Sequence, residues 1–306
     1  MKALPTITLF LLLSFLVPLS AETAGTGLND IARARFNDYW YPNGAEISRF
    51  RLEQARYGGI HEGDAVLIFV TESLNPATQI KADRPSPSDV PVLKLNATRK
   101  FYTGLYPYSI LTSVFTPVDA PDGLPLKLST SVQEWCGHVY QQLNLQSDGY
   151  RLQSHSYFEG EGDQDALLGR HMPEDGLLNQ IRTAPEDLPL GSVRLIPSAV
   201  YNRFVHREPR PADAVGSVKT DIGKSLEGRT LLRYDLAYQS GRRLVIAFEE
   251  AFPHRIQWWE ESYPDRDGQI VTTRAVRTHT LMVDYWNRHD PADRGLLKQL
   301  GLDARP

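Results

Sequence analysis

The chain has 306 residues, of which 41% are hydrophobic, 23% charged and 10% aromatic, and this composition excludes a disordered or collagen-like protein. The 33 Lys and Arg residues against 37 Asp and Glu residues give a net charge of -4, so the chain lacks the broad basic surface of a general nucleic-acid binder. The single cysteine, Cys136, excludes an internal disulfide and a multi-thiolate metal site.

The N-terminus has the pattern of a secretory signal peptide. Lys2 precedes an apolar run over residues 7–17, and small residues follow up to Ala21, the expected cleavage site. The run is shorter than the roughly 20 apolar residues of a membrane-spanning helix, and an uncleaved N-terminal anchor is the alternative. Loss of residues 1–21 removes Lys2 and no acid, which lowers the net charge from -4 to -5. We expect a periplasmic or secreted protein with no stable membrane span after cleavage.

The mature chain begins with one amphipathic helix over residues 28–39, which ends before Pro42. β-Branched and aromatic residues then predominate between turns rich in Gly, Pro, Asn and Asp, which is typical of strands. The strands expected in this first run are residues 46–57, 65–71, 92–102, 108–116, 126–144 and 150–158.

A helical insertion near residues 163–185 divides the strands into two runs, because its leucines follow helical spacing and Pro173 and Pro185 interrupt it. A short C-terminal helix begins at Asp290. Short turns favour antiparallel pairing. We expect a mainly β (α+β) fold in a single domain over residues 22–306, a large curled antiparallel sheet or open β-barrel of roughly ten strands. The second run comprises residues 193–207, 230–238, 242–250, 254–263 and 269–286.

A two-residue turn at Asp148-Gly149 predicts one hairpin in register. It places His138 opposite Glu159, Cys136 opposite Glu161 and Tyr140 opposite Tyr157. Apolar residues then segregate to one face of the hairpin, which supports this register over one shifted by a single residue. The polar face of the hairpin carries Glu134, Cys136, His138, Tyr140, His155, Tyr157 and Glu159.

This polar face predicts a candidate site. A histidine held by a glutamate is suited to act as a general base and a cysteine as a nucleophile, so Cys136, His138 and Glu159 are the catalytic candidates of a hydrolase-like enzyme. Cys136 and His138 lie about 6.5 Å apart along one strand, too far for a hydrogen bond, which favours a buried cysteine and a structural His-Glu pair. The other polar residues of the face are candidates for ligand binding: Glu134, Tyr140, His155 and Tyr157.

Two further hairpins carry aromatic residues. A turn at Ser240-Gly241 places Tyr234 opposite Ala247, and a turn at Asp267-Gly268 places Trp258 opposite Arg277. A cation-π contact between Trp258 and Arg277 is then expected. With other aromatic residues these side chains would line a hydrophobic groove, although an ordinary core explains them as well. The ligand-binding candidates here are Trp258, Trp259 and Arg277.

Motifs of common cofactor enzymes and metalloproteases are absent, so we expect no cofactor and no metal. Four segments stand out: residues 49–58, 92–96, 103–109 and 133–138. They resemble an uncharacterised family of exported bacterial proteins that is often labelled "septum formation inhibitor Maf". The chain lacks the Ser-x-Ser-Pro-Arg-Arg signature of cytoplasmic Maf pyrophosphatases, so the resemblance implies export and no assigned activity.

The expected architecture is also similar to the open β-barrel of LolA-type periplasmic carriers, which bind acyl chains in a hydrophobic concavity. This likeness implies a non-enzymatic binding or carrier module of the cell envelope with a hydrophobic or lipid-like ligand. The alternative is the hydrolase-like enzyme that uses Cys136, His138 and Glu159. Whether the protein has a protein partner is left open by the sequence.

Overall fold

The computed structural model describes residues 30–120 and 122–302, and its strands form one 15-stranded antiparallel sheet that is not closed. This confirms the expected fold class, a mainly β protein with a large curled antiparallel sheet. The predicted signal peptide and its cleavage after Ala21 lie outside the described residues. No helix within the described ranges is long and apolar enough to cross a membrane.

The first half of the sheet follows helix α1 (Asp30–Trp40) and is a meander in which each long strand pairs with the next. The short strand β3 pairs only with β2. The strands are β1 (Ala45–Arg56), β2 (Gly59–Asn75), β3 (Ile80–Lys81), β4 (Val90–Thr103), β5 (Tyr106–Pro117), β6 (Lys127–Glu134), β7 (Gly137–Gln146), β8 (Gly149–Ser156) and β9 (Gln164–Leu167).

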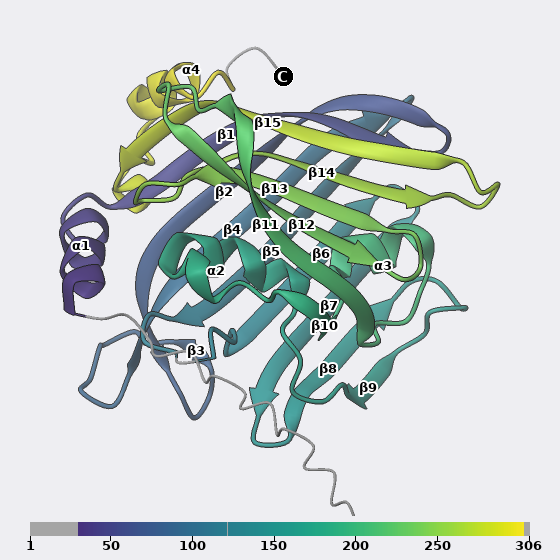
Figure 1. Ribbon diagram of the computed structural model, residues 1–306, viewed down its shortest axis with the longest axis horizontal. Coiled ribbons are helices and arrows are strands. Elements are labelled where there is room, and N and C mark those ends of the chain that lie inside the picture. The colour runs from purple at the N-terminus through teal and green to yellow at the C-terminus, as the bar shows by residue number, and fades with distance from the viewer. Residues whose placement is uncertain (1–29, 121, 303–306) are drawn as a thin grey trace, which may run out of the picture.

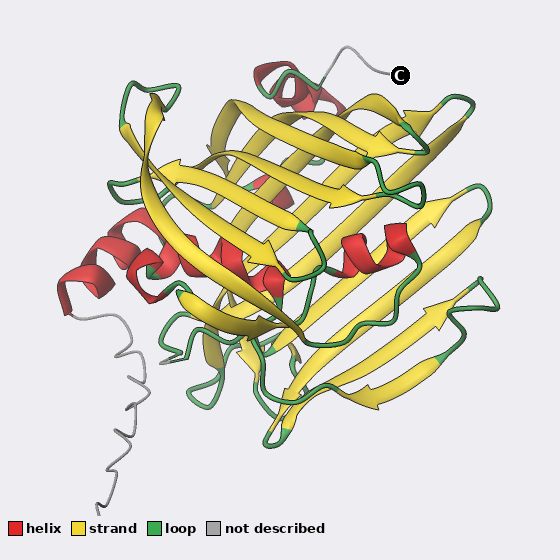
Figure 2. Cartoon of the chain, turned by 45° about the vertical axis from the view of Figure 1, so that its right-hand side comes forward, coloured by secondary structure: helices red, strands yellow, loops and turns green. Residues whose placement is uncertain are grey.

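Residues 174–205, here called the inner segment, connect the two halves of the sheet. Its helices lie inside the curl of the sheet, between its two halves (Figures 1 and 2). Its one strand forms an edge of the sheet beside the second half. The segment contains η1 (Glu174–Gly176), α2 (Leu177–Thr183), η2 (Pro185–Asp187), β10 (Gly191–Leu195) and α3 (Ala199–Val205).

The second half of the sheet is another meander, and its last strand pairs with β1, so the two halves join at the first strand of the chain. Short helices follow on the outside of the sheet, where Leu300 packs against Ala45, Ile47 and Val70. The elements are β11 (Ala212–Lys224), β12 (Thr230–Tyr238), β13 (Arg243–Glu249), β14 (Ile256–Pro264), β15 (Ile270–Val283), η3 (Tyr285–Asn287), η4 (Pro291–Arg294) and α4 (Gly295–Gln299).

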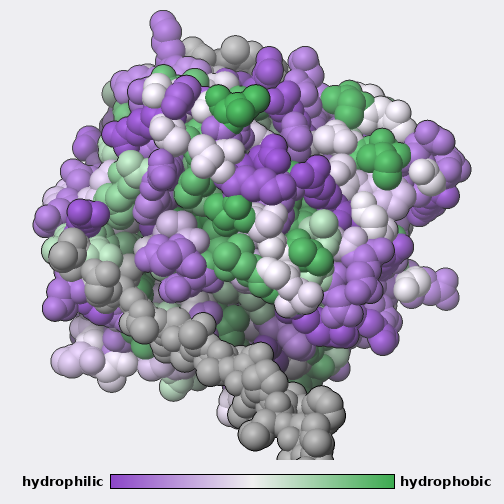
Figure 3. Space-filling view, viewed as in Figure 1, coloured by the Kyte–Doolittle hydropathy of each residue, from purple (hydrophilic) through white to green (hydrophobic). Residues whose placement is uncertain are grey.

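The main hydrophobic core fills the space between the curled sheet and the inner segment. Alternate residues of β1, such as Phe50 and Leu52, meet Leu177 and Ile181 of α2 and Phe204 of α3 in one buried cluster. Figure 3 shows hydrophilic residues over most of one face of the molecule, with apolar residues in small groups among them. The concave side of the sheet is therefore packed with protein.

Several predicted elements were wrong. Residues 193–207 contain β10 and α3 in place of one strand, and Ser198 caps α3 by accepting a hydrogen bond from the amide of Val200 at 3.2 Å. The predicted strand 126–144 is a hairpin whose turn is Trp135-Cys136. Strand β11 was missed because its many polar residues hide the alternation, and the sheet has 15 strands where roughly ten were expected.

The three predicted hairpin registers were also wrong. Gln146 pairs with Gly149, so the first turn is Ser147-Asp148 and the pairing moves by two residues. The other two hairpins have three-residue loops in which Gly241 (φ 84°) and Gly268 (φ 77°) adopt the left-handed conformation, as in a type I turn followed by a bulge. Each of these pairings therefore moves by one residue, with Tyr234 opposite Ile246 and Trp258 opposite Val276.

Three buried ion pairs attach the inner segment to the sheet. The Arg182 guanidinium donates to both carboxylate oxygens of Glu46, at 2.6 and 2.8 Å. No side chain of the three pairs is more than 3% exposed, and each guanidinium lies over at least one aromatic ring. The pairs are Arg182 of α2 with Glu46 of β1, Glu174 of η1 with Arg242 of the β12–β13 loop, and Arg203 of α3 with Glu134 of β6.

We expect Arg182→Met to lower the free energy of unfolding by about 3–5 kcal/mol, because it leaves the Glu46 carboxylate buried without its main counter-charge. The double variant Arg182→Met/Glu46→Leu should recover most of this loss. Urea unfolding followed by circular dichroism measures both effects. Arg151→Met, which removes an exposed pair with Asp165, should cost no more than about 1 kcal/mol, and an equal loss in Arg182→Met would contradict the prediction.

Candidate functional site

The structure does not pair the three catalytic candidates as predicted. Cys136 is exposed in the turn between β6 and β7, so the expectation of a buried cysteine was wrong. His138 is exposed on β7 opposite Gln133, and Glu159 is exposed in the connection after β8. None of the hollows described below is lined by these side chains.

The other polar candidates divide between the two faces of the sheet. Tyr140 and His155 are cross-strand neighbours, with the Tyr140 hydroxyl donating to Gln142 at 2.7 Å. Tyr157 is 66% exposed. Glu134, by contrast, is buried against Arg203 at 2.5 Å. The structure therefore brings together only Tyr140 and His155, on a solvated surface.

The predicted contact between Trp258 and Arg277 was wrong, since the one-residue change in register separates them. Arg277 is buried and binds Glu227 at 2.5 Å, and Gln257 accepts a hydrogen bond from its Nε at 3.3 Å. Trp259 belongs to the core, where its ring centre lies 4.8 Å from that of Phe50. Arg277 has a structural role in this arrangement.

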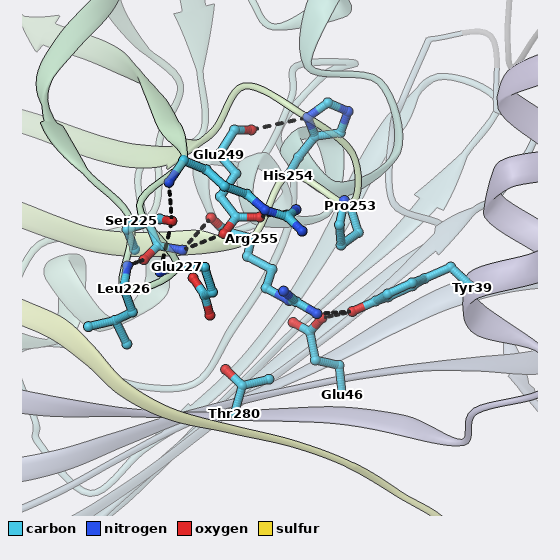
Figure 4. Close-up of polar contacts among 12 residues, drawn as sticks. Tyr39, Glu46, Ser225, Leu226, Glu227, Glu249, Pro253, His254, Arg255 and Thr280 are labelled. Atoms are coloured by element: carbon cyan, nitrogen blue, oxygen red, sulfur yellow. Dashed lines mark hydrogen bonds and ion pairs between the residues drawn. The ribbon is translucent and has the colours of Figure 1, made fainter.

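A second arginine joins one of the buried pairs from the sheet side. Figure 4 shows Arg255 directed at Glu46 and Tyr39, and its guanidinium donates to them at 3.4 and 3.2 Å. Burial would raise the pKa of Glu46, but the charge and hydrogen bonds of Arg182 outweigh burial and lower it to about 2. Burial and the Glu46 charge raise the pKa of Tyr39 to about 12. These groups keep one charge state at neutral pH, which suits structure better than proton transfer.

A small inner cavity of about 60 Å³ lies between the sheet and the inner segment. Three carboxyl groups and one arginine contribute to a wall that is otherwise mainly apolar. The apolar residues that line it are Leu67, Leu95, Ala97, Ile110, Leu178, Val200, Leu244, Ile246 and Trp259.

The carboxyl groups of the inner cavity differ in their partners. Glu174 binds Arg242, and Glu261 binds Arg99 at 2.6 Å. Within the described part of the chain Asp175 has no such cation, and it accepts a hydrogen bond from the Ala199 amide at 3.0 Å. Burial, together with the neighbouring charge of Glu174, raises the pKa of Asp175 to about 6.

A larger outer cleft lies at the end of the sheet where α3 ends. It consists of two hollows of about 400 Å³ each, which share Tyr201, Arg207 and Ser240. Aromatic and arginine side chains are prominent in the first hollow, which is lined by Arg56, Tyr57, Phe204, Tyr263 and Arg266 among others. The second hollow includes Asn202, Arg210, Pro211, Tyr238 and Arg242.

The arginines of the outer cleft differ in how firmly they are held. Arg56 donates to the Phe204 carbonyl at 2.6 Å and stacks over the Tyr57 and Phe204 rings. Arg207 and Arg266 are exposed, and neither side chain has an ion-pair or hydrogen-bond partner among the residues that the structure describes. Asp265 and Asp267 also line the first hollow, where three arginines meet two carboxylates, so Arg207 and Arg266 leave it a small excess of positive charge for an anion.

The inner cavity and the outer cleft are separated by a buried ion pair. Glu174 lines the cavity, Arg242 lines the cleft, and the two side chains bind each other. The Arg242 guanidinium also lies 4.4 Å from the centre of the Tyr201 ring, which the two hollows share. The Glu174–Arg242 pair and the Tyr201 ring therefore form the wall of the outer cleft that faces the inner cavity.

No group of three or more His, Cys, Asp or Glu side chains within residues 30–120 and 122–302 is arranged to hold a metal ion. Comparison of the chain with protein-family models, curated proteins and solved structures gave no match. The geometry of the outer cleft is therefore the basis for a functional proposal.

We expect the stability contributed by Asp175 to depend on pH. Its pKa in the folded state is above the ordinary 3.8, so this contribution is complete below about pH 4 and is lost as the pH rises through about 6. Asp175→Asn should therefore raise the free energy of unfolding at about pH 8 by roughly 2–3 kcal/mol relative to the wild type, and change it little at pH 4.

Urea unfolding at both pH values measures this difference. Asp165→Asn is the control, because Asp165 lies on the surface and Arg151 lowers its pKa, so that substitution should have a small effect of opposite sign. Equal effects of Asp175→Asn at the two pH values would contradict the prediction.

Proposed function

We propose that this protein is a non-enzymatic binding module of the cell envelope that holds a hydrophobic or lipid-like ligand with an anionic group in the outer cleft. The observation that carries the proposal is the pair of hollows of about 400 Å³, in which aromatic walls meet the unpaired Arg207 and Arg266. Hollows of this size suit a small ligand, which the walls would largely enclose.

The lining supports an amphipathic ligand. The walls of the first hollow include the rings of Tyr201, Phe204 and Tyr263, each 6% exposed, and that of Tyr57, which is 62% exposed and offers rigid apolar area at low entropic cost. A guanidinium presents two parallel donors to a carboxylate or phosphate, so Arg207 and Arg266 favour an anionic group at the open side of the cleft.

The inner cavity is a poorer candidate for the same ligand. Its volume of about 60 Å³ holds only a few water molecules, and three carboxyl groups border it. The arginines next to the cavity are already paired with Glu174 and Glu261, and the ionised Asp175 carboxylate would repel an anionic head.

Export is part of the proposal. The apolar run that precedes Ala21 supports a cleaved signal peptide and a periplasmic or secreted location. The acyl chain that the LolA-type likeness implies would have to bind elsewhere than in such carriers, because the inner segment fills the concave side of the sheet. We therefore place the apolar part of the ligand in the outer cleft.

The test uses cis-parinaric acid, a fluorescent fatty acid, with the purified mature chain. We expect saturable binding, and the double variant Arg207→Ala/Arg266→Ala should lose at least about tenfold in affinity, because it removes the charge-assisted contacts to the carboxylate. Fluorescence titration measures both dissociation constants. The matched control is Arg151→Ala/Arg194→Ala, which removes two exposed arginines from β8 and β10.

Parinaric acid methyl ester separates charge from apolar contact. The neutral ester should bind the wild type more weakly than the acid does, and the cleft variant should bind the ester and the acid alike. The proposal fails if the wild type shows no saturable binding, or if the cleft variant and the control variant bind the acid with equal affinity.

A further inference from the structure

Three neighbouring hairpins end in uncharged turns at one end of the sheet. They are the turns Tyr57-Gly58, Gly104-Leu105 and Trp135-Cys136, here called the apolar tips, and they join β1 to β2, β4 to β5 and β6 to β7. These six strands are consecutive in the antiparallel sheet, so the three turns lie at the same end of the strands, on the right-hand side of Figure 1.

The apolar tips present large side chains to solvent. Tyr57 is 62% exposed, Leu105 is 79% exposed and Trp135 is 68% exposed, and Tyr102 beside the second tip is 60% exposed. Strands lie about 4.8 Å apart, so successive hairpins follow each other at about 10 Å and the tips form a row about 20 Å long. Because the tips are evenly spaced, their exposed side chains form one continuous row and are not scattered singly over the surface.

Charge distinguishes these tips from the other connections of the sheet. Counting β2 to β4 as one connection, every other link between consecutive strands contains a charged residue, such as Asp148 between β7 and β8 or Glu227 between β11 and β12. The tip residues 57–58, 104–105 and 135–136 contain none. Contact of the tips with an apolar phase therefore requires no charge in them to be desolvated.

We propose that the apolar tips dock this protein on the surface of a lipid bilayer. Trp and Tyr favour the headgroup region of a membrane, where the ring is buried and the polar atom stays hydrated, and Leu105 would reach the acyl boundary. Tyr57 and Gly58 also line the outer cleft, so a docked molecule holds the cleft next to the bilayer.

A second copy of the chain fits the tips less well. The four exposed side chains offer roughly 600 Å² at most, below the about 800 Å² that each partner of a stable complex usually buries. Binding to a bilayer requires no such minimum buried area, because each inserted side chain contributes separately to the free energy of partitioning.

The test is flotation of the full mature chain with vesicles of phosphatidylethanolamine and phosphatidylglycerol. We expect the wild type to float and the variant Tyr102→Ser/Leu105→Ser/Trp135→Ser to partition at least about tenfold more weakly. The control Tyr41→Ser/Ile80→Ser/Trp286→Ser removes three exposed apolar side chains outside the apolar tips and should float like the wild type. An environment-sensitive fluorophore on Cys136, the single cysteine, should shift to the blue with vesicles.

This proposal is separate from ligand binding, because the tip variant keeps Tyr57 and should bind cis-parinaric acid in solution as the wild type does. The proposal is overturned if the wild type does not float, if the tip and control variants float equally, or if the tips instead form a dimer in solution that the tip variant abolishes. Loss of parinaric acid binding in the cleft variant has no effect on the flotation result.

Discussion

Three arginine–glutamate pairs buried between the inner segment and the sheet determine how the rest of the molecule is arranged. Burial of a charge is expensive unless it is paired, so each pair allows only the one geometry in which both partners meet. Each pair joins a different helix of the inner segment to a different part of the sheet. The segment is thereby held against the concave side as part of the core, and the hollow that a curled sheet would otherwise present is filled with protein.

Because the inner segment fills the concave side of the sheet, the space available to a ligand lies at the end of the sheet. The Arg242 side chain both binds Glu174 and supports the Tyr201 ring, so the same contact closes the inner cavity and forms the wall of the outer cleft. Arg207 follows directly after α3 and gains its position from that helix. We propose that this scaffold, with Arg207 and Arg266 exposed at an aromatic cleft next to the apolar tips, holds an amphipathic molecule at a membrane surface.

The sequence predicts the fold class because most strands show a clear strand pattern. Prediction of single elements fails where that pattern is weak, and prediction of the hairpin register fails where it depends on the length of the loop. β1 was predicted from its β-branched and aromatic residues between turn residues, whereas β11 is rich in polar residues and was missed. The one-residue errors at the loops that contain Gly241 and Gly268 came from assuming two-residue turns. They changed which side chains share a face, and the predicted Trp258 contact was lost.

The outer cleft was missed because Arg56, Arg207 and Arg266 are distant in sequence and only the curl brings them together. The buried ion pairs were missed as well, and there a signal was available: Glu46 is a charged residue at an inward position of a predicted strand.

Native-state hydrogen exchange of the α2 and α3 amides tests most directly the claim that the buried ion pairs hold the inner segment against the sheet. Because the ion pairs hold both helices against the sheet, these amides should exchange only with global unfolding, at the same free energy as the amides of β1. Exchange of α2 and α3 by local opening, with β1 still protected, would contradict it.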